Sequence, residues 1–178
     1  MVDIDLIIKK ALDMGFTVVS KLDCSTIKLL PEVRDMCSSN KCNMYNKNWS
    51  CPLGCGTLDE CKENVKKYKE GIIVQTVGEL EDSMDFENME RIAQKHNKIF
   101  IKFSDEIKDE YDNILALGSG ACTKCNRCTY PDSSCKFPKK IISSMEAYGM
   151  IVSQICIDNN VKYYYGINTL AYTGCFLI

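Results

Sequence analysis

Residues 118–138 read GSGACTKCNRCTYPDSSCKFP and carry four cysteines at short, regular spacing. Cys122, Cys125 and Cys128 form a C-x2-C-x2-C pattern, and Cys135 follows after six further residues. In ferredoxins, three thiolates at this spacing let one loop reach three irons of a cubane cluster. Zinc sites instead combine two C-x2-C pairs separated by a longer stretch. The spacing therefore favours an iron–sulfur cluster over zinc, with Cys135 as its fourth ligand or as a ligand of a different cluster.

A second group of cysteines lies in residues 36–61, MCSSNKCNMYNKNWSCPLGCGTLDEC, where the spacing is looser and fits no single standard motif. Thr57 and Glu60 form a capping-box pattern, which predicts that a helix begins directly after Thr57. Cys61 would then lie in the first turn, where the helix dipole and free N–H groups favour a thiolate. A four-ligand site leaves one of the five cysteines over, and we expect it to be Cys55, which lies between two glycines. The predicted ligands of this group are Cys37, Cys42, Cys51 and Cys61.

Twelve cysteines against one histidine in 178 residues limit the chemistry that the chain can perform. Disulfides require export, but the N-terminus MVDIDLIIKK carries acids where a signal peptide carries bases. No stretch approaches the roughly 18 consecutive apolar residues of a membrane helix. We therefore expect a cytoplasmic protein with reduced thiols and no membrane association. The single histidine argues against zinc catalysis built on histidines and against a Ser-His-Asp triad.

The remaining cysteines, Cys24, Cys156 and Cys175, stand alone in apolar sequence, and we interpret them as small buried hydrophobic residues. The one histidine, His96, lies among lysines and asparagine near the end of a predicted helix. We expect it to be exposed in the last turn of that helix and to serve neither as a ligand nor as a base.

Charge is spread unevenly along a chain whose net charge is −2. This balance provides no basic field for nucleic acid, which we do not expect as a partner. Residues 79–112 hold eleven acidic and five basic side chains, a net −6 that we interpret as solvated surface. Residues 122–140 hold five basic side chains and one acidic side chain, a net +4 beside the second cysteine group. These cations would either offset the charge of a cluster and attract an acidic partner, or contact an anionic substrate.

The rest of the sequence predicts short helices and strands in alternation. Helices are expected over residues 3–14, 58–68, 84–96 and 143–159, the last opened by a second capping-box pattern. Strands are expected over residues 16–19, 27–30, 72–77, 99–103, 114–117, 162–165 and 170–177. A cysteine loop, a capped helix and a strand thus occur twice, which indicates two similar units in a pseudo-symmetric arrangement. We predict an α/β fold, with α+β as the alternative, in which residues 1–178 form a single compact, cysteine-rich metal-binding domain.

Both cysteine stretches resemble a known family, the predicted metal-binding proteins called domain of unknown function 2284. The resemblance rests on NKCNMYNKNWSCP (40–52) with GTLDEC (56–61), and on residues 118–138 followed by SMEAYG (144–149). It covers nearly the whole chain, and it implies metal binding without implying a reaction. The ligands that it implies are Cys37, Cys42, Cys51 and Cys61, and then Cys122, Cys125, Cys128 and Cys135.

Three hypotheses of function follow from these observations. The first is an iron–sulfur protein that binds two [4Fe–4S] clusters and exchanges electrons with a redox partner protein. The second is an iron–sulfur enzyme, in which one cluster lacks its fourth thiolate and an open iron binds a small anionic or sulfur-containing substrate. The third is a zinc-binding structural module. The sequence leaves open the catalytic residues, the substrate, the redox partner and the oligomeric state.

Overall fold

A five-stranded sheet lies at the centre of the computed structural model, which describes residues 2–178. The strands follow the order β1-β2-β5-β3-β4, and neighbours are antiparallel except for β3 and β4. Their bounds are β1 Val18–Asp23, β2 Glu70–Glu79, β3 Leu115–Gly118, β4 Ser143–Ser144 and β5 Thr169–Leu177. The fold is a mixed α/β structure, as the sequence predicts.

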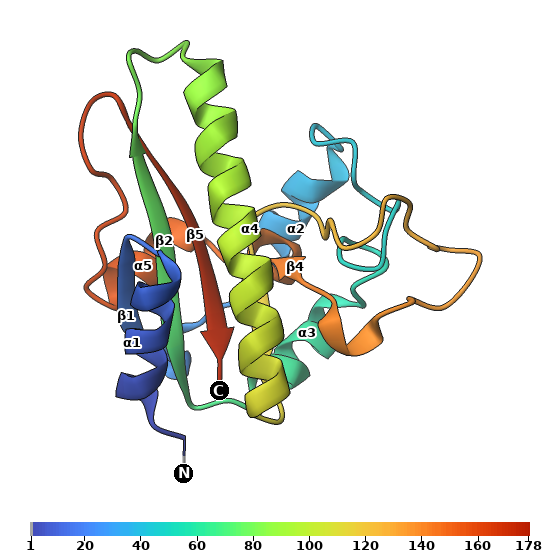
Figure 1. Ribbon diagram of the computed structural model, residues 1–178. Coiled ribbons are helices and arrows are strands. Elements are labelled where there is room, and N and C mark those ends of the chain that lie inside the picture. The colour runs from blue at the N-terminus through green and yellow to red at the C-terminus, as the bar shows by residue number, and fades with distance from the viewer. Residues whose placement is uncertain (1) are drawn as a thin grey trace.

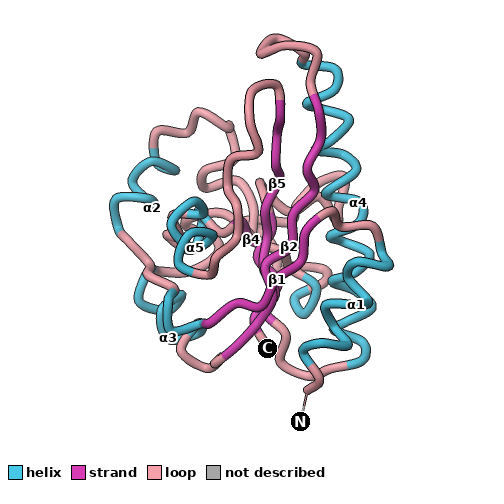
Figure 2. Tube along the Cα trace, turned by 90° about the vertical axis from the view of Figure 1, so that its left-hand side faces the viewer, coloured by secondary structure: helices cyan, strands magenta, loops and turns pink. Residues whose placement is uncertain are grey.

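Helices cover both faces of this sheet (Figures 1 and 2). Helices α1 (Ile4–Met14) and α4 (Phe86–Glu110) pack on one face. Helices α3 (Leu58–Val65) and α5 (Val152–Asp158) contribute to the core on the other face, and α2 (Pro31–Ser38) lies on that same side in Figure 2. The short 3-10 turns are η1 (Cys24–Thr26), η2 (Pro138–Lys140) and η3 (Glu146–Tyr148).

The central strand β2 shows why the sheet needs cover on both sides. Ile72 and Val74 belong to the core shared with α1 and α4, whereas Ile73 belongs to the core shared with α3 and α5. All three side chains are fully buried, because successive residues of a strand point to opposite faces. On the neighbouring strand β5, Phe176 stacks on Phe100 of α4 with 4.5 Å between the ring centroids. Apolar packing on both faces thus fixes the register of the sheet.

The order of elements repeats around the two central strands. The first unit consists of a helix, a strand, a cysteine loop, a second helix and a second strand. These elements are α1, β1, residues 37–57, α3 and β2. They follow again as α4, β3, residues 122–137, α5 and β5, apart from short intervening elements. The strand order β1-β2-β5-β3 is also symmetric about the β2–β5 pair, because the second strand of each unit is central and the first strand of each unit lies outside it. The two units predicted from the sequence are therefore present, and each contributes one antiparallel strand pair.

One long helix replaces a predicted helix and the predicted strand after it. Helix α4 runs over Phe86–Glu110, so the prediction of a strand over residues 99–103 is wrong. Buried residues recur every three or four positions along the helix, and they include Ile92, Phe100, Phe103 and Ile107. This spacing forms one apolar stripe on a helix, which explains why the local apolar run is not a strand.

His96 lies inside this stripe and is completely buried, so the prediction of an exposed side chain is wrong. Its Nδ1 shares a hydrogen bond of 2.9 Å with Thr76 Oγ1, and its ring stacks on Tyr172. Nε2 has no hydrogen-bond partner among residues 2–178. Burial lowers the pKa of His96 to about 4, so the ring is neutral at neutral pH.

Three other predicted elements also differ from the structure. Residues 27–30 and 162–165 form no strand, and the helix predicted over 143–159 is divided into β4, η3 and α5. The division comes at Gly149, whose φ of 88° ends η3 in a left-handed conformation that glycine adopts easily. Within residues 2–178, no helix combines the length and the apolar character needed to cross a bilayer.

Candidate metal centre

The two cysteine loops lie side by side, to the right of the sheet in Figure 1. The indole N–H of Trp49 donates a hydrogen bond of 3.1 Å to the carbonyl of Ser133. The hydroxyl of Tyr130 donates one of 2.5 Å to Asn46 Oδ1, and the rings of Tyr130 and Trp49 meet edge to face at 4.8 Å. Aromatic and polar contacts therefore join segments more than 80 residues apart in the chain.

The second cysteine group converges on one small hollow. Its lining includes all of the predicted ligands of this group, Cys122, Cys125, Cys128 and Cys135. Trp49, Phe137 and Ile141 also line the hollow, and they form an apolar wall beside the sulfurs. The backbone N–H of Phe137 donates to Cys135 Sγ at 3.4 Å. Such N–H to sulfur contacts stabilise thiolates and influence the potential of a cluster.

Lysines beside this hollow are paired with helix α4. Lys124, whose side chain is 10% exposed, lies 2.6 Å from Asp105, and Lys140 lies 3.7 Å from the same carboxylate. Lys140 also lies 3.9 Å from Asp109. Part of the positive charge of residues 122–140 is thus neutralised by carboxylates of residues 79–112. The acidic stretch therefore makes specific ion pairs and is not solvated surface alone. Both lysines still line the hollow that holds the second group of sulfurs.

The first cysteine group forms a row of neighbours between α2 and α3. Cys37 lies in α2, and burial together with nearby Cys42 and Cys51 raises the pKa of its thiol. Burial also raises the pKa of Cys51, with a smaller contribution from neighbouring Cys55. Cys61 lies in α3 and is only 1% exposed. The structure therefore brings the four predicted ligands of this group into one region, and it brings Cys55 there as well.

The helix that carries Cys61 begins as the sequence predicts. Thr57 Oγ1 accepts a hydrogen bond of 3.2 Å from the backbone N–H of Glu60. The Glu60 carboxylate accepts one of 2.7 Å from the backbone N–H of Thr57. This reciprocal pair completes the capping box and fixes the start of α3 at Leu58, three residues before Cys61.

Arg34 brings a positive charge to the first group. Its guanidinium donates to Cys61 Sγ at 3.8 Å and to Cys55 Sγ at 3.9 Å, and it is held by the carbonyl of Gly56 at 2.8 Å. The interaction between the neighbouring side chains of Cys55 and Cys61 raises the pKa of Cys55 and lowers that of Cys61, and the charge of Arg34 lowers both. Cys61 is therefore the better thiolate of this pair.

Ser50 connects the two cysteine groups. Its hydroxyl lies 4.0 Å from Cys51 Sγ, and the same oxygen accepts a hydrogen bond of 2.9 Å from the backbone N–H of Cys122. Asn48 Oδ1 accepts from the Ser50 hydroxyl at 2.6 Å and holds it in place. One buried serine thus separates a cysteine of the first group from the backbone of the second.

The donor set consists of thiols, which as thiolates suit both iron–sulfur clusters and zinc. Within residues 2–178, no three Cys, His, Asp or Glu side chains converge closely enough to hold a single metal ion. A [4Fe–4S] cluster binds each thiolate at a different iron, so its ligands stand farther apart than those of one ion. Four sulfurs around a common hollow are compatible with this wider arrangement.

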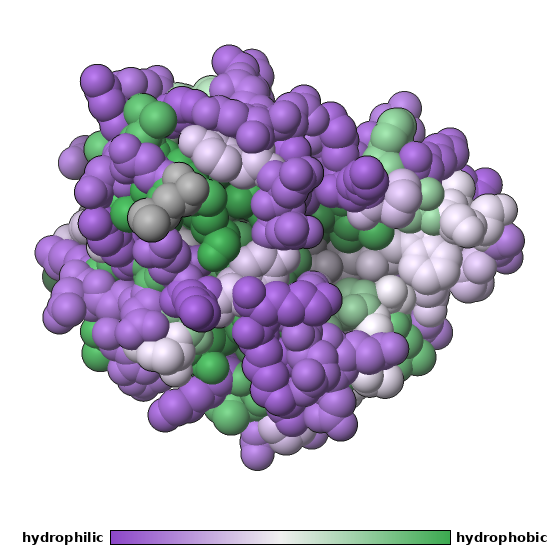
Figure 3. All heavy atoms as spheres, turned by 90° about the horizontal axis from the view of Figure 1, so that it is seen from below, coloured by the Kyte–Doolittle hydropathy of each residue, from purple (hydrophilic) through white to green (hydrophobic). Residues whose placement is uncertain are grey.

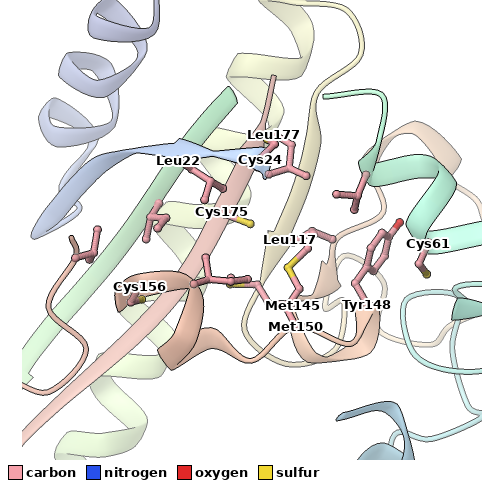
Figure 4. Close-up of a cluster of buried hydrophobic side chains, with 14 residues drawn as sticks. Leu22, Cys24, Cys61, Leu117, Met145, Tyr148, Met150, Cys156, Cys175 and Leu177 are labelled. Atoms are coloured by element: carbon pink, nitrogen blue, oxygen red, sulfur yellow. The ribbon is translucent and has the colours of Figure 1, made fainter. Parts of the chain in front are cut away.

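The three isolated cysteines lie in the core on the α5 side of the sheet, a core that also includes Cys61 of the first group (Figure 4). Cys156 and Cys175 are fully buried, and Cys24 is 7% exposed. Burial raises the pKa of Cys24 to about 12 and that of Cys156 to about 11, so both remain neutral thiols. Their interpretation as small hydrophobic residues is confirmed.

Comparison with known families gives a match that agrees with this site. The sequence pattern of the predicted metal-binding proteins DUF2284 matches residues 20–178. The chain belongs to this family. The match includes both cysteine groups of the DUF2284 chain and all of its strands except the first two residues of β1. No curated protein and no solved structure matched the chain.

The sequence gives no indication that two side chains, Arg34 and Lys108, lie near the site. Arg34 reaches the first group because α2 turns it toward α3, and Lys108 lies beside the cysteine loops because α4 continues past residue 96. Burial, aided by the charge of Lys124, lowers the pKa of Lys108 to about 8. A lysine or arginine on an amphipathic helix is ordinarily a surface residue, so only the tertiary arrangement identifies these two.

Proposed function

We propose that this protein is an iron–sulfur protein that binds two [4Fe–4S] clusters and transfers electrons. One cluster would be held by Cys122, Cys125, Cys128 and Cys135, and the other by Cys37, Cys42, Cys51 and Cys61. Each cluster would supply one-electron redox chemistry when bound. Membership in a predicted metal-binding family supports the metal, and the proposal adds its identity and its role.

The observation that carries the proposal is the hollow lined by all four cysteines of the C-x2-C-x2-C and Cys135 set. Trp49 and Phe137 would limit access of water to this site, which stabilises a bound cluster and tunes its potential. Lys124 and Lys140 also line this hollow, and because Asp105 and Asp109 pair with them, they would offset only part of the negative charge of four thiolates. These features match a redox centre better than they match a purely structural ion.

The first group supports a second cluster through its own charge compensation. Arg34 is aimed at the sulfurs of Cys61 and Cys55, so a thiolate-rich site would be partly neutralised. Cys55 neighbours both Cys51 and Cys61, and it is therefore an alternative to one of the four proposed ligands of this group. Transfer of electrons between the two sites would use their contact through Ser50.

Reductive titration tests the electron-transfer role. We expect the anaerobically purified protein to be brown and to take up about two electrons per chain, one for each cluster. The reduced protein should give paramagnetic resonance signals broadened by interaction between two nearby clusters, because Ser50 contacts a residue of each group. A colourless protein that takes up no electrons would contradict the proposal and favour the zinc-binding structural module.

A further inference from the structure

A second hollow lies beside the first cysteine loop, and Cys55 is the one cysteine within residues 2–178 that lines it. It has a volume of about 350 Å³ and is lined by the first cysteine loop, α3, α4, β3 and the segment after the second cysteine loop. This volume lies within the range of small-molecule sites in proteins. Figure 3 shows the molecule from below, where hydrophilic side chains surround hollows with apolar side chains at their base.

Lys108 supplies a cation to this cavity that the protein itself does not neutralise. Its Nζ donates one hydrogen bond of 3.4 Å, to the carbonyl of Ile141. In the described range 2–178, no carboxylate lies within ion-pair distance of it, whereas Lys124 and Lys140 share Asp105. A partly buried ammonium without a counter-charge is costly, because burial removes water from the charge. An anion in the cavity would remove that cost.

Other side chains complete a site of mixed character. Tyr148 is 8% exposed, and its hydroxyl accepts a hydrogen bond of 3.2 Å from the Asn64 amide. Among residues 2–178 no acceptor takes the proton of that hydroxyl, so it is free to donate to a ligand. Trp49 and Ile114 give the cavity an apolar wall, and Lys139 adds a second cation.

We propose that this cavity binds a small organic anion, with its carboxylate or phosphate group on Lys108 and its apolar body against Trp49 and Ile114. The proposal goes beyond electron transfer, and it does not depend on the identity of the metal. Cys55 also lines the cavity, so a bound anion would lie against the first cysteine group. This position suits a substrate or a regulator of that group.

Calorimetric titration of the intact, metal-loaded protein tests this site with two probes, benzoate and phenyl phosphate. Benzamide, which has the same ring but no charge, is the control ligand. We expect at least one of the anions to bind with a stoichiometry of about one per chain, and the neutral ring to bind at least tenfold more weakly. The anion that binds more tightly identifies the head group that the site prefers.

Two variants of α4 locate the binding. Lys108→Met removes the charge and keeps an unbranched side chain that is only one atom shorter, and we expect it to weaken anion binding at least tenfold. Lys98→Met, an exposed position on the same helix, should leave binding unchanged. Lys108→Arg keeps the charge and should retain most of the affinity, which separates loss of the cation from loss of the fold.

The iron content of each sample is measured in parallel, so loss of a cluster is distinguished from loss of the anion site. Binding of neither anion to the intact protein, or equal binding by the two methionine variants, would overturn the proposal.

Discussion

Replacement of Cys125 by alanine is expected to remove one whole cluster, which would halve the iron and sulfide content of the protein. Cys125 is the middle residue of the C-x2-C-x2-C pattern and lines the hollow of the second group. A cubane that loses one of its thiolates in a solvent-reachable loop has an exposed iron and is easily lost. The measurement is iron and acid-labile sulfide per chain after anaerobic purification.

The matched control for this experiment is Cys156→Ala. Cys156 lies in α5 and is fully buried in the core, so its replacement tests the loss of a thiol outside both groups. The Cys156→Ala protein should keep both clusters, and its free energy of unfolding should fall only by the contribution of a small buried apolar side chain. If Cys125→Ala retained all of its iron with an unchanged spectrum, Cys125 would not be a ligand. Far-ultraviolet circular dichroism of both variants reports whether the sheet is still folded.

Acidification is expected to destabilise the protein through its one histidine. In the folded state, burial holds the pKa of His96 at about 4, whereas an unfolded histidine titrates near 6.5. The unfolded state therefore binds more protons below pH 6.5, and the free energy of unfolding falls as the pH decreases from 6.5 to 4. Full protonation of the unfolded chain costs about 3 kcal/mol of stability, because one pKa unit corresponds to about 1.4 kcal/mol.

The variant His96→Gln isolates this contribution, since glutamine can still bond to Thr76 and does not titrate. Urea unfolding of both proteins at about pH 7 and about pH 4 should show a pH-dependent loss that is about 3 kcal/mol smaller in the variant. Titration of the single histidine by nuclear magnetic resonance provides a direct check. A ring that titrates near its ordinary pKa would show that His96 is accessible to water, contrary to its burial.

The sequence was sufficient for those features that depend on local spacing. The capping box before Cys61 uses hydrogen bonds between residues three apart, so its pattern is read correctly. The strand predicted over residues 72–77 lies within β2. It could be predicted locally, because a run of β-branched and apolar side chains is typical of a buried strand. The apolar run after His96 was misread because a buried helix and a buried strand look alike over five residues.

The arrangement of the candidate site depends on contacts that span the chain. Ser50 meets Cys122 across 72 positions, and Lys108 meets Ile141 across 33. No local pattern encodes such contacts, since they form only when the two halves of the sheet and their loops assemble. The ligand residues could therefore be proposed from spacing alone, whereas the closeness of the two groups and the anion cavity required the fold.

The metal and sulfide content of the anaerobically purified protein tests the central proposal most directly. Two sites of four cysteines each predict about eight iron atoms and about eight acid-labile sulfides per chain. About half of that content would indicate that only one group holds a cluster. Zinc without acid-labile sulfide would contradict the assignment of either group to an iron–sulfur cluster.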